Sequence, residues 1–347
     1  MAGDGPWLAL DIGGTTLRAG AYDPLEGRLL AVERGPAPSF LTCPGLDQAG
    51  LRAELVAALV ALAKHLGLAQ PTVVSAGFPG PVDARGWVLR APTLWGPGAE
   101  PDPFAARLQA AWPGARVLVA NDLCAAGCCF LRDPGEDFCV VTVSSGIGHK
   151  LFLGGRPVVG AGGRGGEIGH WRVDFSDDAP HCDCGGQGHL GAVASGRATA
   201  WQAARLRARD PAAFAASALG HALAGDLGRL DNVALATAFT EGDPWAAALV
   251  GALAAPLGRA LAAVHVLAGV ERFVLMGGFA HALGSGYRAL LAQAAAASTW
   301  DLGQDWTTML QPGVLGDDAG VLGAGHLARG QLFGPQRPLP PASGVTP

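Results

Sequence analysis

The sequence has few charged residues and no long run of one charge. Of its 347 residues, 15% are charged and 50% are hydrophobic, and the net charge is -5. Such a composition supports a large buried core and excludes a mostly disordered chain. The absence of a basic block argues against nucleic acid or an anionic membrane as a partner. We expect two domains or one large bilobal unit.

Signals for export and for membrane insertion are also scarce. The first six residues are acidic and contain Gly and Pro, so they predict no signal peptide. The most apolar span, 246–270, is interrupted by Pro256, Arg259 and His265 and predicts a buried helix pair, not a membrane span. Seven cysteines, three of them within 124–129, favour a reducing cytoplasm over a disulfide framework. We therefore expect a cytoplasmic protein.

Predicted strands and helices alternate along the chain, which is typical of an α/β fold. Helical periodicity predicts helices at 51–66 and 318–327. Apolar runs predict strands at 7–11, 17–23, 28–33, 72–78, 116–120, 138–143, 150–153 and 272–276. The order strand, Gly/hydroxyl turn, strand occurs near the start and again from residue 138, which predicts a duplicated fold.

The first of these turns is suited to phosphate. It contains Asp11, the glycines Gly13 and Gly14, and the hydroxyls of Thr15 and Thr16. Glycines let successive N–H groups face phosphate oxygens, and a carboxylate can hold Mg²⁺ directly or through water. The turn is not a Walker A loop, because the Lys-Ser/Thr ending is missing. An ordinary hairpin turn is the alternative.

The second turn, 144–148, has the same chemistry without the acid. Its candidate phosphate contacts are Ser145 and Gly146. Two such turns facing one another would clamp a triphosphate from both sides. Gly277 and Gly278 follow a predicted strand and would let the chain pass close to a purine, although a plain strand-to-helix turn is equally compatible. The sequence thus predicts binding of ATP with Mg²⁺.

A candidate general base follows another strand. Asn121 and Asp122 stand between the strand at 116–120 and a predicted helix, where α/β proteins often place active-site residues. Phosphoryl transfer to a hydroxyl requires a group that accepts its proton, and Asp122 can do so. The alternative is that Asp122 is a helix N-cap.

The densest chemical signal is a Cys/His segment. His170, Cys182, Cys184 and His189 offer two imidazoles and two thiolates, a ligand set suited to tetrahedral Zn²⁺. His181 is a competing fourth ligand to His189. A closed four-ligand site is structural, so the metal would organise the loop without taking part in catalysis.

Together these motifs resemble the ROK family of sugar kinases, in the actin/hexokinase/Hsp70 ATPase superfamily. The resemblance extends from residue 7 to about residue 328. The matching segments are 11–15 (Asp-Ile-Gly-Gly-Thr), 77–83 (Gly-Phe-Pro-Gly-Pro-Val-Asp), 121–122 (Asn-Asp), 167–170 (Glu-Ile-Gly-His), 182–188 (Cys-x-Cys-Gly-x-x-Gly), 194–196 (Ala-Ser-Gly) and 277–278 (Gly-Gly).

The resemblance implies a two-lobed, duplicated ribonuclease H-like (actin-like ATPase) fold with an inserted zinc-binding loop. The expected small lobe is 1–119 completed by a C-terminal helix at 317–331, and the large lobe is 120–316 with the zinc loop at 167–191. Residues 334–347 are expected to be a disordered tail. Asp122 corresponds to the family's catalytic base, and a homodimer is expected. The implied substrate contacts are Asn121, Glu167, His170, Gly80 and Thr93.

The chain departs from the family pattern at four places. Two of these changes remove expected sugar contacts, whereas the residues expected to bind phosphate are kept. His189 replaces a Cys, which imidazole can do at zinc, and Ser144-Ser145 replaces Gly-Thr. Gly191 stands where the family has a sugar-binding Glu, and Thr93 where it has an Asn. Losing one charged hydrogen bond costs about 1.5–3 kcal/mol, so two losses could reduce affinity roughly a thousandfold. We expect an altered or relaxed sugar preference.

The expected function is therefore ATP-dependent phosphorylation of a hexose, with glucose at its 6-hydroxyl as the default. Kinases of fructose or of N-acetylated hexosamines are alternatives, as is a catalytically decayed sugar-binding protein. A sugar-responsive repressor is disfavoured, because Asp11 lies too near the start for a preceding helix-turn-helix and the net charge is negative. The residues do not distinguish ATP from polyphosphate as the donor.

Overall fold

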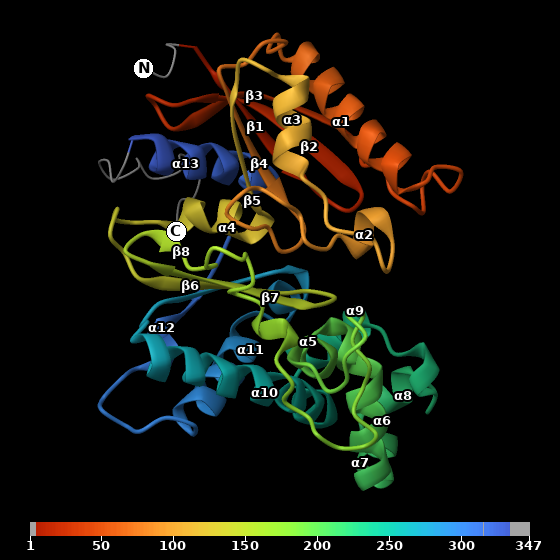
Figure 1. The fold of residues 1–347 in the computed structure, drawn as a ribbon. Coiled ribbons are helices and arrows are strands. Elements are labelled where there is room, and N and C mark those ends of the chain that lie inside the picture. The colour runs from red at the N-terminus through yellow and green to blue at the C-terminus, as the bar shows by residue number, and fades with distance from the viewer. Residues whose placement is uncertain (1–4, 315, 334–347) are drawn as a thin grey trace. The chain divides into compact units, whose positions relative to one another are not determined.

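The computed structural model describes residues 5–314 and 316–333 as two compact units, each built on one sheet (Figure 1). The first unit takes the described residues of 1–136, 152–165 and 315–347, and the second takes 137–151 and the described residues of 166–314. Residues 120–136 thus pack with the first unit, whereas the sequence places the lobe boundary at 119. The predicted tail, 334–347, lies outside the described residues.

The sheet of the first unit has the strand order β3-β2-β1-β4-β5. Its strands are β1 (Trp7–Ile12), β2 (Thr16–Asp23), β3 (Arg28–Pro36), β4 (Val73–Phe78) and β5 (Arg116–Asn121). β1 pairs antiparallel with β2 but parallel with β4, and β4 pairs parallel with β5. The carboxyl ends of β1, β4 and β5 therefore meet at one edge of the sheet, where ligands bind in open α/β sheets.

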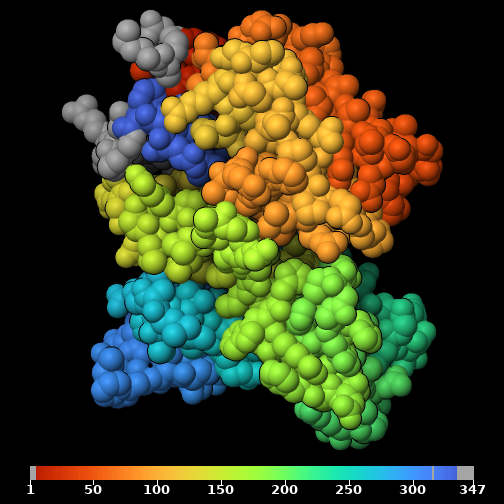
Figure 2. All heavy atoms as spheres, viewed as in Figure 1, coloured from red at the N-terminus to blue at the C-terminus, as the bar shows by residue number. Residues whose placement is uncertain are grey.

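Helices cover both faces of this sheet. Leu8 and Leu10 of β1 point into one core, and Trp7 and Ala9 point into a second core on the opposite face, as the two-residue period of a strand requires. The first core includes residues of α1 and α3, and the second includes α4 and α13; in the space-filling view α3 and its surroundings hide the sheet (Figures 1 and 2). The helices are α1 (Gln48–His65), α2 (Pro92–Trp95), α3 (Phe104–Ala111), α4 (Asp122–Gly127), η1 (Cys128–Phe130) and α13 (Ala319–Phe333).

The second five-stranded sheet has the same topology as the sheet described above. Its order is β10-β9-β6-β7-β8, so β6 to β10 occupy the places of β1 to β5 in turn. This correspondence confirms the predicted duplication. The short strands β8 and β10 were not predicted from the sequence. The strands are β6 (Phe138–Val143), β7 (Ile147–Leu153), β8 (Arg156–Pro157), β9 (Phe273–Met276) and β10 (Leu310–Pro312).

The second unit's core lies between this sheet and a set of mostly apolar helices. These are α5 (Leu190–Ala194), α6 (Thr199–Arg209), α7 (Pro211–Ala216), α8 (Ala218–Ala222), α9 (Asn232–Thr240), α10 (Pro244–Ala268), α11 (Gly278–Ala296) and α12 (Trp306–Met309), with the short 3₁₀ turns η2 (Ile168–His170), η3 (Gly196–Ala198) and η4 (Leu227–Arg229). α11 is broken at Gly284, whose backbone is not helical.

α10 corrects one prediction, because it is a single helix and not a helix pair. Pro256 lies inside it and is buried, so the core contacts on both sides hold the helix together where a proline removes one hydrogen bond. α10 is long and apolar enough to cross a membrane, but Leu249, Leu253 and Leu257 are fully buried in the core. The prediction that this segment is buried core is therefore confirmed.

Candidate functional site

The first predicted phosphate turn is the tight connection between β1 and β2. The N–H of Gly13 donates to the carbonyl of Thr16 at 3.0 Å, and a Cβ at Gly13 would lie 2.7 Å from that oxygen. Only glycine fits there without moving the turn. Gly14 faces α2, since a Cβ on it would lie 3.6 Å from the Cβ of Thr93. The predicted substrate contact Thr93 thus stands beside the phosphate turn.

Asp11 has a partner that the sequence did not reveal. Its Oδ2 accepts from Nη1 of Arg18, one strand away, at 3.1 Å. Burial raises the pKa of Asp11, and the Arg18 guanidinium opposes that rise. Gly320 of α13 lies so close that a Cβ there would be 2.4 Å from the carboxyl carbon of Asp11. Asp11 is therefore held rigidly at the carboxyl end of β1, and its assignment to Mg²⁺ stays a prediction.

The predicted base lies where β5 passes into α4. Asn121 is the N-cap of α4: its Oδ1 accepts from the Leu123 N–H at 3.0 Å, and its Nδ2 donates to the Gly80 carbonyl at 2.9 Å. Asp122 is the first helical residue and not the cap, and its Oδ1 also accepts from the Leu123 N–H, at 2.8 Å. The structure thus brings Gly80, Asn121 and Asp122 together at the carboxyl ends of β4 and β5.

Gly80 is required by the backbone. Its φ is +131°, and a Cβ would lie 2.2 Å from the carbonyl oxygen of Arg90. An L-residue rarely adopts this conformation, and the space for a side chain is filled. The Gly80 carbonyl is fixed in the position where it receives the Asn121 amide.

The second predicted turn joins β6 to β7 in the second unit. The Ser144 N–H donates to the Gly146 carbonyl at 2.9 Å, and the Ser145 carbonyl accepts from the buried hydroxyl of Ser195 at 2.9 Å and from Nε of Arg197 at 2.6 Å. Gly277 packs on β6, with a φ of +97° that leaves no room for a Cβ beside the Val143 carbonyl.

A cavity of about 570 Å³ adjoins this turn. The turn contributes Ser144 and Ser145, α11 begins at the cavity with Gly278 and Phe279, and α9 supplies a wall of mixed apolar and polar side chains. Its complete lining is Ser144, Ser145, Asn232, Val233, Ala236, Thr237, Thr240, Glu241, Gly278, Phe279 and Ala282. The cavity has the size of a small-molecule site.

The α9 wall was missed by sequence reasoning. Its polar members are Asn232, Thr237 and Thr240 of α9 and Glu241, the residue that follows the helix. An exposed helix shows the same weak pattern, so only the fold distinguishes this wall from an ordinary surface.

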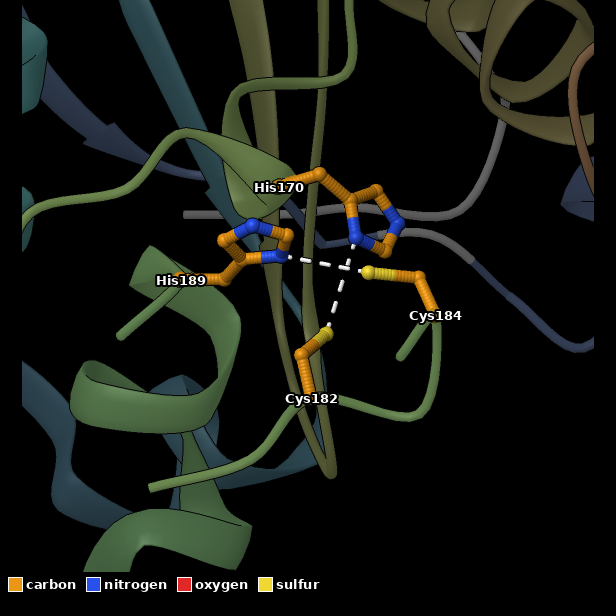
Figure 3. A group of neighbouring side chains, drawn as sticks. All are labelled: His170, Cys182, Cys184 and His189. Carbon is orange, nitrogen blue, oxygen red and sulfur yellow. Dashed lines mark hydrogen bonds between the residues drawn. The ribbon is translucent and has the colours of Figure 1, made fainter. Parts of the chain in front are cut away.

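The four predicted zinc ligands converge in the second unit (Figure 3). One ligand atom from each of His170, Cys182, Cys184 and His189 lies within 4.8 Å of the others. Sγ of Cys184 is 3.2 Å from Nδ1 of His189, and Sγ of Cys182 is 3.6 Å from Nδ1 of His170. Tetrahedral Zn²⁺ with bonds of about 2.0–2.3 Å spaces its ligand atoms about 3.3–3.8 Å apart. The donor set and its spacing fit zinc, and the group contains His189 and not the competing His181.

The His/Cys cluster is connected through the backbone to two predicted substrate contacts, Glu167 and His170. Glu167 directly precedes η2, and His170 ends that turn, so one ligand and one predicted sugar contact share a single turn of chain. His189 is the N-cap of α5, whose second residue is Gly191. The Glu167 carboxylate accepts from Nζ of Lys150 on β7 at 2.6 Å, a contact that the sequence did not predict.

Gly191 has a normal backbone but little space. A Cβ there would lie 3.2 Å from the Gly169 carbonyl oxygen and 3.6 Å from the Ile147 nitrogen. Any side chain at this position must therefore emerge between η2 and the turn that begins β7. Because Gly191 has no side chain, α5 places no carboxylate between η2 and this turn.

Comparison with known proteins agrees with this architecture. The ROK family pattern matches residues 7–331. A C(7)-cyclitol 7-kinase from Streptomyces hygroscopicus subsp. limoneus is 38% identical over 95% of both chains, and a 2-epi-5-epi-valiolone 7-kinase from an Actinoplanes species is 35% identical over 82% of this chain and 80% of its own.

Among solved structures, the ROK hexokinase from Thermus thermophilus has a TM-score of 0.68 at 30% identity and covers 92% of this chain and 97% of its own. The ROK family glucokinase from Streptomyces griseus, solved with glucose and AMPPNP, has a TM-score of 0.67 at 27% identity and covers 94% and 99%. The two five-stranded sheets and the His/Cys cluster are consistent with a ROK-family fold. The chain therefore belongs to the ROK family of sugar kinases.

Proposed function

We propose that this chain transfers the γ-phosphoryl group of ATP to a hydroxyl of a C7 cyclitol. One observation carries the proposal: the resemblance to the family implies a retained base and retained phosphate turns, whereas Gly191 and Thr93 stand where it implies two sugar contacts. A cyclitol is a carbocycle without the ring oxygen and anomeric hydroxyl of a sugar, so it needs a different set of contacts. The relatives named as cyclitol and valiolone kinases, at 38% and 35% identity, support the same substrate class.

In this proposal the nucleoside of ATP occupies the 570 Å³ cavity beside α9, where Phe279 and Val233 offer apolar surface and Asn232 and Thr237 offer polar groups. The β6–β7 turn and the β1–β2 turn supply backbone N–H groups and hydroxyls to the phosphates. Asp11 would hold Mg²⁺, directly or through water, and the ion would supply positive charge that neutralises the phosphates.

Asp122 accepts the proton of the attacking hydroxyl. Its place at the start of α4, beside the amide of Asn121 and the carbonyl of Gly80, gives a polyol both a base and hydrogen-bonding groups on one rigid edge. Glu167 and His170 are the proposed substrate contacts on the second unit, and the zinc cluster keeps them in place. The reaction is in-line transfer, in which positioning supplies most of the catalysis.

Glucose phosphorylated at the 6-hydroxyl is the second candidate. Asn121, Asp122, Glu167 and His170 stand at positions that match the family's catalytic base and sugar contacts, and the Streptomyces griseus glucokinase, solved with glucose, matches over 94% of this chain. We propose a cytoplasmic location and a homodimer in either case.

The test is a coupled ADP-release assay with MgATP over a panel of 2-epi-5-epi-valiolone, glucose, fructose and N-acetylmannosamine. We expect the highest kcat/KM for the cyclitol, and Asp122→Asn should lower kcat by about 10²–10⁴-fold. Turnover of glucose at a higher kcat/KM than the cyclitol would select the second candidate. Absence of ADP release above the Asp122→Asn variant for every polyol would refute both candidates.

A further inference from the structure

The chain contains only two lysines, Lys64 and Lys150, among 24 basic residues. Lys64 is exposed in the last turn of α1. Lys150, on β7, is in the opposite environment: its side chain is 2% exposed. A buried ammonium is costly unless it is paired and hydrogen-bonded, so its partners define its role.

Two of its partners lie in the segment just before η2. Nζ of Lys150 donates to Oε1 of Glu167 at 2.6 Å and to the carbonyl of Gly166 at 3.1 Å. Gly166 has a φ of +80°, and a Cβ on it would lie 2.7 Å from Cδ of Lys150 and 3.0 Å from Nζ. The glycine thus leaves room for a narrow alkyl chain and a compact ammonium, and a planar guanidinium needs more width.

The neighbouring His149 holds the same segment at a second point. Its Nδ1 accepts from the N–H of Ile168 at 3.3 Å, and its ring is buried. Two successive side chains of β7 therefore bind three successive residues, 166 to 168, and fix the backbone from which Glu167 projects. The segment leads directly into η2 and the zinc ligand His170.

The two members of the ion pair differ in exposure. Glu167 is 32% exposed, whereas Lys150 is almost completely covered. A ligand can therefore reach the carboxylate but not the ammonium. Because Lys150 holds Oε1 of Glu167, the rest of the carboxylate keeps one orientation toward solvent. Recognition of a hydroxyl requires such a fixed acceptor.

We propose that Lys150 is a positioning residue that orients Glu167 for a ring hydroxyl of the substrate and thereby sets polyol affinity. The inference rests on the proposed function, in which Glu167 contacts the polyol. Lys150 acts on the polyol through Glu167, both directly and through the Gly166 backbone beside it, so its effect on polyol affinity should depend on that carboxylate.

A double-mutant cycle on the full chain tests this. Lys150→Met, Glu167→Gln and the double variant are compared with the wild type in steady-state assays with 2-epi-5-epi-valiolone and, in parallel, with glucose. Each single change should raise the KM for the polyol about 10- to 100-fold, the usual effect of losing a charged hydrogen bond, with the KM for MgATP unchanged. The double variant should match Glu167→Gln within about threefold, because the two residues form one unit. Lys64→Met is the matched control and should resemble the wild type.

The possible outcomes separate the inference from the proposed function. Additive effects in the double variant, or a Lys150→Met enzyme with unchanged KM, would overturn the role of Lys150 alone. An unchanged polyol KM in Glu167→Gln would overturn the proposed substrate contact, as would failure of both polyols to react, and the inference would fall with it. Should Lys150→Met not fold, Lys150→Gln, which keeps a donor but no charge, completes the cycle with the same expected values.

Discussion

Protonation of His149 should destabilise the protein as the pH falls. The imidazole is buried on β7, and burial, with a further contribution from the nearby Lys150 ammonium, lowers its pKa to about 4. Its Nδ1 accepts a hydrogen bond from the Ile168 N–H, which only the unprotonated nitrogen can do. Acid therefore acts on a group that must stay neutral in the folded protein.

The sign and size of the effect follow from linkage. An unfolded histidine titrates near pH 6.5, above the folded pKa of about 4, so the unfolded state binds more protons between these values. The stability is fully present above about pH 6.5 and is lost as the pH falls toward 4. Between pH 7 and pH 5 the loss from this one residue is about 2 kcal/mol.

The measurement is urea unfolding followed by tryptophan fluorescence at pH 7 and pH 5. His149→Asn places an amide oxygen near the position of Nδ1 and cannot be protonated, so it should lose about 2 kcal/mol less than the wild type over this interval. His65→Asn, at the exposed end of α1, is the control and should follow the wild type. Equal pH dependence of wild type and His149→Asn would refute the reasoning.

Three further perturbations test other parts of the site. Cys182→Ser combined with Cys184→Ser should reduce the zinc content from about one ion per chain to none and lower the Tm; a metal-free wild type of unchanged Tm would contradict this. Gly80→Ala should lower the free energy of unfolding by about 1–3 kcal/mol in chemical denaturation, because its Cβ would meet the Arg90 carbonyl; an unchanged midpoint would show that the loop relaxes freely. Gly191→Glu should raise kcat/KM for glucose relative to 2-epi-5-epi-valiolone, and Gly191→Ala, which tests the space alone, should not.

The strands and their turns were predicted well because their signals are local. β6 has the predicted bounds, and β1 differs by one residue, since an apolar run bounded by Gly and hydroxyl residues specifies a strand on its own. The edge strands β8 and β10 were missed, because two or three residues carry no periodicity and pair only when a neighbour is present. Pro256 misled the prediction for α10, because packing on the core keeps a helix continuous that local rules would break.

The zinc ligands show the same division. The residue types and their spacing predicted a zinc site from the sequence. The sequence did not distinguish His181 from His189 as the fourth ligand, because both are close enough in the chain to Cys182 and Cys184. In the fold, His189 occupies the N-cap position of α5 and its ring lies in the cluster, whereas the backbone of His181 pairs with that of Gln187 and its side chain is not in the cluster. The sequence likewise allowed Asp122 to be either a general base or a helix N-cap. In the structure, Asn121 is the N-cap of α4.

The sequence by itself indicated the family, the duplicated α/β fold, the Gly turns and a Cys/His segment with His181 and His189 as alternatives for its fourth ligand, since these patterns are visible along the chain. Only the tertiary structure decided which distant groups meet: Arg18 with Asp11, α9 with the β6–β7 turn, and Lys150 with Glu167. Such contacts depend on strand register and on which glycines leave space, as Gly166 does for Lys150. Local sequence patterns therefore specify the helices, the strands and the reactive side chains. Burial and packing decide which distant side chains those reactive groups contact.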